Sequence, residues 1–321
     1  MLLSFTERKL NKLFFKQIYT FFKGMIIKMK LNYEIKNSDF DKTVNQILID
    51  QFHFSNRLLT KLINDKNIYF NDAKIDTRSI INCNGILKIN FDYEEDSSNI
   101  ASTKMDLDII YEDEWMIVVN KPAGCPIHPS RLHYKDSLSN GIKYYFSSIN
   151  LNKKIRPVNR LDLNTSGLVI FAKCEYIQEQ FSNQMAKDLF KKEYLCLVNG
   201  ILEEKKGTID LPISRKQGSI IEREINENGK KSVTHYIVLN EFDNYSLVHC
   251  KLETGRTHQI RVHMQAIGHP ICGDTLYGKS SDLINRQALH SYKIECIHPV
   301  NKSILRLNAD LPNDMKKLIN V

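Results

Sequence analysis

Asp162 is the residue of this chain whose type and setting best suit chemistry, and it lies in the run 157–167, two positions after Arg160. The run is too rich in Asn, Thr, Ser and Gly to form a helix, and the apolar stretch 168–172 that follows it predicts a strand. A carboxylate fixed on a loop by a rigid strand is a common way to present a covalent nucleophile or a general base. The alternative, which residue type and spacing alone favour, is an Asp that caps a turn.

Arg261 lies on a predicted helix over residues 257–267, with Thr257 as its N-cap and Gly268 at its end. Because they are three residues apart, His258 and Arg261 share one face of this helix. A guanidinium beside a partly buried Asp would keep that carboxylate ionised against the cost of desolvation. A solvated polar face explains the same pattern.

Tyr194 lies in the strand-like run 192–200, 32 residues after Asp162. This spacing is enough for one strand, one helix and a return strand, which would bring the two residues side by side. The helix is predicted over residues 175–190, because apolar residues recur there at every fourth position. The ring could pack against a base while its hydroxyl takes part in proton transfer, or Tyr194 could be an ordinary core residue.

The run 159–167, Asn-Arg-Leu-Asp-Leu-Asn-Thr-Ser-Gly, resembles the signature of the RluA-type pseudouridine synthases, His-Arg-Leu-Asp-x-x-Thr-Ser-Gly. It departs from that pattern at the first position, where Asn159 stands for His. The run 192–200 resembles the family's strand with the active-site tyrosine, and the run 254–264, followed by 268–274, its block with the active-site basic residue. Lesser similarities lie at 119–124 and 289–291, so the resemblance covers about residues 106 to 312.

The resemblance implies an enzyme that breaks the bond from ribose carbon 1′ to uracil nitrogen, turns the base and joins carbon 5 to the same ribose carbon. Such a site needs no metal and no cofactor, and we expect neither. Asp162 would be the reactive carboxylate, as nucleophile or as base, with Arg261 as its partner and Tyr194 packed against the uracil. The alternative is a non-catalytic RNA-binding factor in ribosome assembly.

The target uridine must leave the RNA stack, at a cost of a few kcal/mol. Arg160 would fill the vacated space or hold a phosphate, Arg256 would contact a phosphate, and Asn159 would change how the RNA is held rather than the chemistry. Lys121, His128 and His290 fit an RNA contact or a structural role equally well. The residues expected to contact RNA are Asn159, Arg160, Thr165, Arg256, His258, Gln259, Arg57 and Lys61.

The domain organisation that we predict is a basic extension over 1–30, a small unit over 31–93, a flexible acidic linker over 94–104 and a catalytic domain over 105–321. In the small unit, Ser55 is expected to cap a helix that bears Leu58, Leu59, Leu62 and Ile63, with Arg57 and Lys61 on another face. A strand at 68–70 with its turn at 71–72, and a second strand at 86–89, are expected to follow.

The small unit resembles an S4-like α/β RNA-binding domain, with Arg57 and Lys61 on the face toward RNA. Asn56 stands where that family usually has its first Arg, and residues 31–95 hold eight basic against ten acidic groups, so the expected grip on RNA is weak. An appended S4-like domain favours large-subunit ribosomal RNA as the substrate, with transfer RNA as the alternative.

From residue 105 onward, predicted strands outnumber helices and do not alternate with them, which indicates an α+β fold with a mixed, largely antiparallel sheet and flanking helices, the pseudouridine synthase fold, and argues against a doubly wound fold. Paired strands are expected at 109–111 and 116–119, and a hairpin at 232–239 and 245–252.

The formal net charge of +8 suggests a polyanionic partner, but residues 1–30, with seven Lys and Arg against Glu7, hold +6 of it. RNA binding must therefore rest on local patches. The seven cysteines are scattered without a Cys-x-x-Cys pair, which argues for a reducing compartment and against disulfides or a zinc site. No apolar run approaches the roughly 18 residues that span a membrane. We predict a cytoplasmic monomer that acts on structured RNA.

Overall fold

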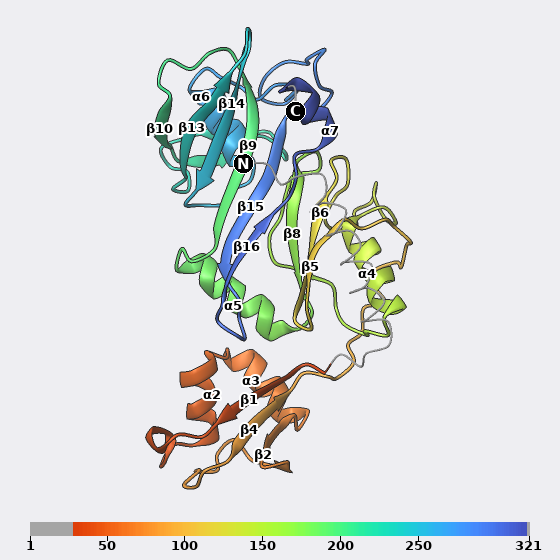
Figure 1. The fold of residues 1–321 in the computed structure, drawn as a ribbon, viewed down its shortest axis with the longest axis vertical. Coiled ribbons are helices and arrows are strands. Elements are labelled where there is room, and N and C mark those ends of the chain that lie inside the picture. Colours follow the sequence, from red (N-terminus) through yellow and green to blue (C-terminus); the bar gives the residue numbers. More distant parts are fainter. Residues whose placement is uncertain (1–27, 320–321) are drawn as a thin grey trace, which may run out of the picture. The chain divides into compact units, whose positions relative to one another are not determined.

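The structure, a computed structural model, describes residues 28–319, so the predicted basic extension lies almost entirely outside the described residues. The chain forms two compact units, each described here by itself. The first unit holds the described residues up to Ile117 together with Ser139–Val158 and Phe171–Asn183. The second unit holds Val118–Leu138, Asn159–Ile170 and the described residues from Gln184 onward. Figure 1 labels the elements.

The first unit opens with a four-stranded antiparallel sheet and two short helices. The strand order is β1 (Lys30–Glu34), β4 (Ile86–Asn90), β2 (Ile68–Phe70) and β3 (Ala73–Lys74). The helices are η1 (Asn37–Asp39), α2 (Val44–Phe52) and α3 (Asn56–Asn64). The predicted strands at 68–70 and 86–89 are confirmed, as is the turn between them, where Asn71 and Asp72 both have left-handed backbone.

Helix α3 begins as predicted, because the Ser55 hydroxyl accepts a hydrogen bond from the Leu58 N–H. Leu58, Leu59 and Leu62 are buried. Ile63 falls beside this buried stripe and is 40% exposed.

The other elements of the first unit include α4 (Leu138–Ser148), β5 (Ile109–Glu112), β7 (Arg156–Pro157) and α5 (Glu175–Ala186). Strand β5 lies next to β6 (Met116–Lys121), as predicted. Helix α5 ends four residues before the predicted Phe190, because the chain turns through left-handed backbone at Asp188. Leu189, which continued the apolar spacing, is exposed.

The stretch 94–104 is not the loose acidic linker that its composition predicted. The Glu95 carboxylate is buried and accepts two hydrogen bonds from the Arg156 guanidinium, at 2.6 and 2.7 Å. Lys61 lies between Glu95, at 3.2 Å, and Glu175 of α5, and over the ring of Tyr93. Composition alone does not reveal that Glu95 forms a buried ion pair with Arg156, 61 positions later.

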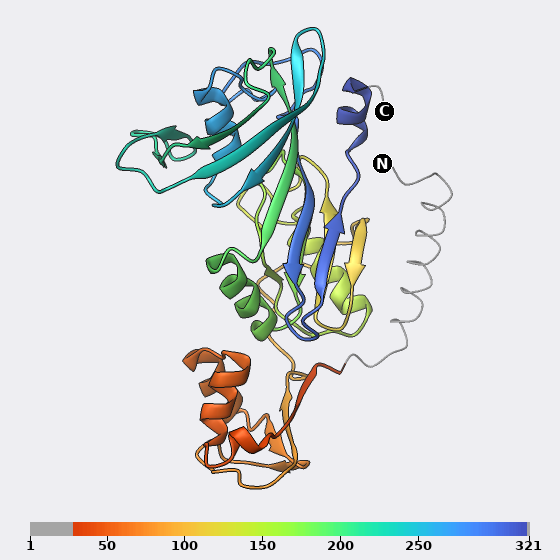
Figure 2. The same ribbon diagram turned by 60° about the vertical axis from the view of Figure 1, so that its left-hand side comes forward.

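The second unit is built on long antiparallel strands, which Figures 1 and 2 show running together. The order is β10 (Lys206–Asp210), β13 (Val233–Glu241), β14 (Tyr245–Leu252), β9 (Lys191–Asn199), β15 (Leu289–Ile297) and β8 (Ser166–Ala172), with β16 (Ile304–Asn308) paired to β15. The predicted hairpin is β13 and β14. Strand β8 pairs with β15 in parallel, Ser166 opposite His290 and Gly167 opposite Ser291.

Three further elements complete this unit: a two-stranded ribbon of β11 (Ile213–Arg215) and β12 (Arg223–Ile225), helix α6 (Gln259–Ala266) and helix α7 (Asn313–Leu318). Ile260 and Met264 of α6 are buried in the same core as Cys196 and Val248 of the sheet, so these apolar residues dock the helix on the sheet. The predicted α+β class with a largely antiparallel sheet is confirmed. Among the described residues, no helix is long and apolar enough to cross a membrane.

Candidate active site

Asp162 and Arg261, 99 positions apart, meet in the second unit. The Arg261 Nη1 group donates a hydrogen bond to Asp162 Oδ2 at 3.1 Å. The rest of this guanidinium is held by Asp274, because Nε donates to Oδ2 at 2.6 Å and Nη2 to Oδ1 at 2.9 Å. Asp274 is 1% exposed and Arg261 8%, whereas Asp162 is 24% exposed. Asp162 is therefore the accessible end of a buried ion-pair chain.

The charge of Arg261 is secure in this arrangement. Burial acts to lower its pKa, but the hydrogen bonds and charges of Asp274 and Asp162 outweigh burial and hold that pKa above its usual value. The guanidinium carbon also lies 5.0 Å from the centre of the Tyr277 ring, a cation–π contact.

Asp274 is a residue of the site that sequence analysis did not single out. It follows Gly273, whose backbone is left-handed (φ +72°) and where an added Cβ would lie 2.3 Å from the Arg286 carbonyl oxygen. The backbone N–H groups of Leu276 and Tyr277 donate to Asp274 Oδ1, so the carboxylate also closes its own turn. An Asp after a Gly reads as a turn residue, and nothing in its spacing attaches it to an arginine 13 positions earlier.

Asn159, expected to contact RNA, is instead buried and fully occupied by backbone. Its Nδ2 group donates to the Leu168 carbonyl oxygen and its Oδ1 atom accepts from the Ile170 N–H, both at 2.9 Å. The expectation was wrong because the side chain completes backbone hydrogen bonds along β8, which fixes the start of the Asp162 loop to its strand.

Lys121 fixes the other side of the same loop. Its ammonium is fully buried and donates to the carbonyl oxygens of Pro122, Cys125 and Leu163 at 2.8 to 2.9 Å. Burial lowers the pKa of Lys121 to about 8. Since Leu163 directly follows Asp162, the role of Lys121 is structural rather than an RNA contact.

Thr165 and Gln259 were also expected to contact RNA and are also buried. The Thr165 hydroxyl accepts a hydrogen bond from Gln287 Nε2 at 3.4 Å. Gln259 Oε1 accepts from Thr254 and from the Arg256 N–H, and its Nε2 donates to the Val233 carbonyl oxygen. Both expectations were wrong, because each side chain is buried and its polar atoms form hydrogen bonds within the protein.

His258 is the N-cap of α6 in place of the predicted Thr257, and it has left-handed backbone (φ 60°) and makes no side-chain cap. Such backbone is strained for a residue other than glycine. It places His258 Nε2 3.8 Å from Asp162 Oδ2. Burial is the main cause that lowers the pKa of His258, so the ring is neutral at pH 7.

The neighbours of this ring fit one of its two neutral forms. The Arg223 N–H donates to the Tyr277 hydroxyl oxygen at 2.7 Å, and that hydroxyl lies 2.8 Å from His258 Nδ1. The Tyr277 hydroxyl can donate to Nδ1 when the ring carries its proton on Nε2. In this tautomer an N–H group lies toward Asp162.

Tyr194 lies on β9 opposite Ser291 of β15 and Cys250 of β14. It is 7% exposed, and burial raises its pKa, with the nearby Asp162 charge adding to the rise. The Tyr194 hydroxyl therefore stays protonated, and Tyr194 lies close enough to Asp162 for that charge to affect its pKa. The structure thus brings Asp162, Arg261, Tyr194 and His258 together.

The remaining candidates fall into two groups. Arg160 and Arg256 of the second unit, and Arg57 on α3, are exposed and available to RNA. His128 is exposed as well, and burial and the charge of Arg160 lower its pKa. Lys61 is held in its ion pairs within the first unit, and buried His290 bonds to the Ser166 hydroxyl at 2.9 Å.

This chain is similar to proteins of one family. Residues 115–266 match the family described as RNA pseudouridylate synthase. An RNA pseudouridine synthase of Bacillus subtilis, YjbO, is 39% identical over 266 residues, which cover 83% of this chain and 94% of that protein. Ribosomal large subunit pseudouridine synthase D of Nitrosomonas europaea is 38% identical over 235 residues, 70% of this chain and 68% of that protein.

Among solved structures, Human RNA Pseudouridylate Synthase Domain Containing 1 superposes with a TM-score of 0.55 and 26% identity, over 71% of this chain and 96% of that one. These matches show that this α+β protein is an RNA-modifying isomerase. The chain belongs to the RNA pseudouridine synthase family.

Proposed function

We propose that this pseudouridine synthase acts on large-subunit ribosomal RNA and that Asp162 is its reactive carboxylate. The observation that carries the second part is the Asp274–Arg261–Asp162 chain, in which only the last carboxylate is accessible. Either proposed route, attack on ribose carbon 1′ or removal of a ribose proton, needs an ionised and reachable Asp.

Asp274 explains how Arg261 can orient Asp162 without neutralising its charge. Two of the guanidinium donors are already engaged by Asp274, and one reaches Asp162. The three groups carry a net charge of −1, so Asp162 keeps its negative charge while Arg261 orients it. A lone Arg–Asp pair would bind the carboxylate more tightly and make it less nucleophilic.

Tyr194 and His258 are proposed to serve the uracil. The Tyr194 ring would pack against the detached base, and its raised pKa keeps the hydroxyl as a donor. The His258 Nε2–H, directed toward Asp162, would donate to the ionised acid or to a uracil oxygen beside it. Arg160, exposed and two positions from Asp162, would occupy the space that the flipped uridine leaves.

The RNA target is inferred from relatives. Proteins named ribosomal large subunit pseudouridine synthase D are 31 to 38% identical to this chain, and the one of Neisseria meningitidis serogroup B aligns over 301 residues, 90% of the chain. An alignment of that length includes the first unit's N-terminal sheet. We propose that this part of the chain is an S4-like domain that presents Arg57 to ribosomal RNA. Transfer RNA is the alternative substrate. All seven cysteines are free thiols, which suits the cytoplasm, where such RNA is found.

Release of tritium from RNA labelled at uridine carbon 5 tests the proposal. We expect release from a large-subunit ribosomal RNA transcript, none with Asp162→Ala, and normal release with Asp136→Asn, an exposed acid of the same unit that pairs with His133. Full activity of Asp162→Ala would refute its role. Release from transfer RNA but not from ribosomal RNA would refute the target. Mapping pseudouridines in RNA from a strain that lacks the gene would identify the site.

A further inference from the structure

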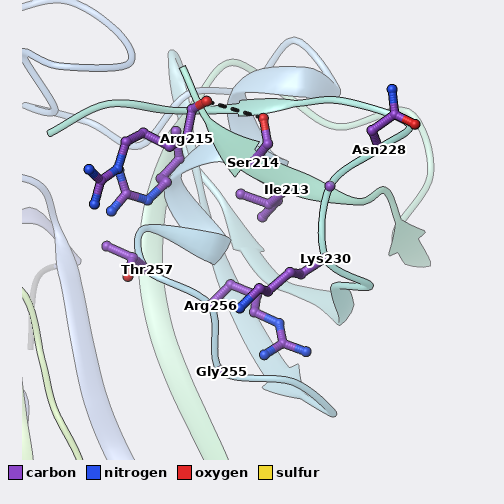
Figure 3. A pocket seen from close by; sticks show the side chains of 10 residues that line it. Ile213, Ser214, Arg215, Asn228, Lys230, Gly255, Arg256 and Thr257 are labelled. Atoms are coloured by element: carbon purple, nitrogen blue, oxygen red, sulfur yellow. Dashed lines mark hydrogen bonds between the residues drawn. The ribbon is translucent and has the colours of Figure 1, made fainter. Parts of the chain in front are cut away.

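A cavity of about 470 Å³ lies in the second unit, between the β11–β12 ribbon and the loop that leads into α6. Figure 3 shows Arg215 to one side of Ile213 in the view, and Lys230 and Arg256 below it. Arg223 completes a set of four cations in the lining. None of the ten lining residues is acidic, and none is aromatic.

A fifth cation lies at the edge of this cavity. An added Cβ at Gly255 would come within 2.8 Å of Lys192 Nζ, so this ammonium lies against the cavity wall. Burial is the main cause that lowers the pKa of Lys192; the charge of Asp188 opposes this, and repulsion from Arg256 adds to it. The folded protein therefore holds like charges close together, which is unfavourable unless an anion joins them.

These cations differ from the buried ones elsewhere in the second unit. Arg261 and Arg286 each have a carboxylate within 2.6 Å. Over residues 28–319, by contrast, no carboxylate lies within 4.0 Å of the charged groups of Lys192, Arg215, Arg223, Lys230 or Arg256. Arg223 and Arg256 donate to backbone carbonyl oxygens, which fixes the side chains without neutralising them.

The cavity also adjoins the active site. Thr257 in its wall is followed directly by His258, whose Nε2 faces Asp162. The backbone N–H of Arg223, in the opposite wall, donates to the Tyr277 hydroxyl that orients His258. A group bound here would lie next to whatever binds at Asp162.

We propose that this cavity binds a phosphodiester group of the RNA strand that carries the target uridine. Five cations supply the charge, and the hydroxyl of Thr257 is a further donor to phosphate oxygens. The absence of aromatic residues from the lining argues against a site for a base or a free nucleotide, which would need a stacking surface. This inference rests on the proposed function.

Neutralising two cations that have no other assigned role, with Arg215→Gln and Lys230→Gln, tests the inference. We expect each change to weaken binding of a ribosomal RNA fragment about tenfold and to reduce the slope of log K against log salt by about one. The single-turnover rate of tritium release at saturating RNA should stay the same. The melting temperature should stay the same or rise, because like-charge repulsion is relieved.

Arg306→Gln is the matched control, an exposed arginine of the same unit that pairs with Glu295, and it should leave both the affinity and its salt slope unchanged. If the wild type releases no tritium, the proposed function fails. If the wild type is active and the double variant binds RNA with the same affinity and salt slope, the cavity inference fails. If inorganic phosphate raises the melting temperature of the wild type but not of the double variant, while RNA affinity is unchanged, the cavity takes free phosphate and the RNA assignment is overturned.

Discussion

Asp274 and Asp162 bind the same guanidinium, yet replacing each by Asn should lower stability by very different amounts while impairing activity in both cases. Asp162 accepts one hydrogen bond of 3.1 Å and is 24% exposed. Its loss should cost about 1 kcal/mol of unfolding free energy or less, the usual net value of one such bond. Asp274 accepts two bonds, is 1% exposed and closes its own turn.

Asp274→Asn leaves Arg261 buried without its main counter-charge. Removing one partner of a buried ion pair typically costs about 3–5 kcal/mol, and we expect the unfolding free energy to fall by that amount. The guanidinium would also lose its fixed orientation toward Asp162. A misplacement of about 1 Å can slow a reaction about 100-fold, so the folded fraction of Asp274→Asn should release tritium at least that much more slowly.

The measurement pairs urea unfolding at pH 7 with single-turnover tritium release corrected for the folded fraction. Asp162→Asn should be inactive and nearly as stable as the wild type, and Asp136→Asn should match the wild type in both respects. The reasoning is refuted if Asp274→Asn unfolds within 1 kcal/mol of the wild type and keeps its rate, because the buried pair would then neither stabilise nor orient Arg261.

Two more predictions concern the loop and its strand. Asn159→Ala should lower the unfolding free energy by about 2–3 kcal/mol, since two buried backbone groups lose their partners, while RNA affinity per folded molecule stays unchanged; weaker RNA binding at unchanged stability would instead support a contact with RNA. Burial lowers the pKa of His290 to about 4, so its neutral form is favoured by folding, and the stability it contributes above pH 6.5 is lost as the pH falls toward 4. Between pH 7 and 5 this loss is about 2 kcal/mol. His290→Gln should therefore reduce the drop in unfolding free energy over that range by the same amount. An unchanged drop would contradict the lowered pKa of His290.

Local patterns in the sequence predicted local structure well. The Ser55 cap of α3 and the β13–β14 hairpin follow from capping and from alternation, which need only near neighbours. The pairing of Asp162 with Arg261 was also predicted, but through resemblance to a family, since 99 intervening positions give no physical reason to join them.

The errors at the site arise because the partners of its polar side chains are set by the fold. Polar residues near Asp162 were taken as contacts with substrate, and Asn159, Thr165 and Gln259 instead complete internal hydrogen bonds. The helix start was placed at Thr257 because Thr is a good cap, whereas the site requires His258 in left-handed backbone. Asp274 went unassigned, because a carboxylate after Gly is typical of a turn.

The Glu95–Arg156 pair decides how this chain can be shortened. A fragment that starts at residue 105 follows the apparent boundary in composition but discards Glu95, and the buried Arg156 guanidinium then keeps only Glu175, at 3.5 Å. It also discards the Phe91 and Tyr93 carbonyl oxygens that accept hydrogen bonds from the buried Lys153 ammonium. Such a fragment is expected to aggregate on expression even though every element of the second unit is intact. A fragment that keeps the chain from residue 91 onward retains these partners and is the better starting point for isolating the catalytic part.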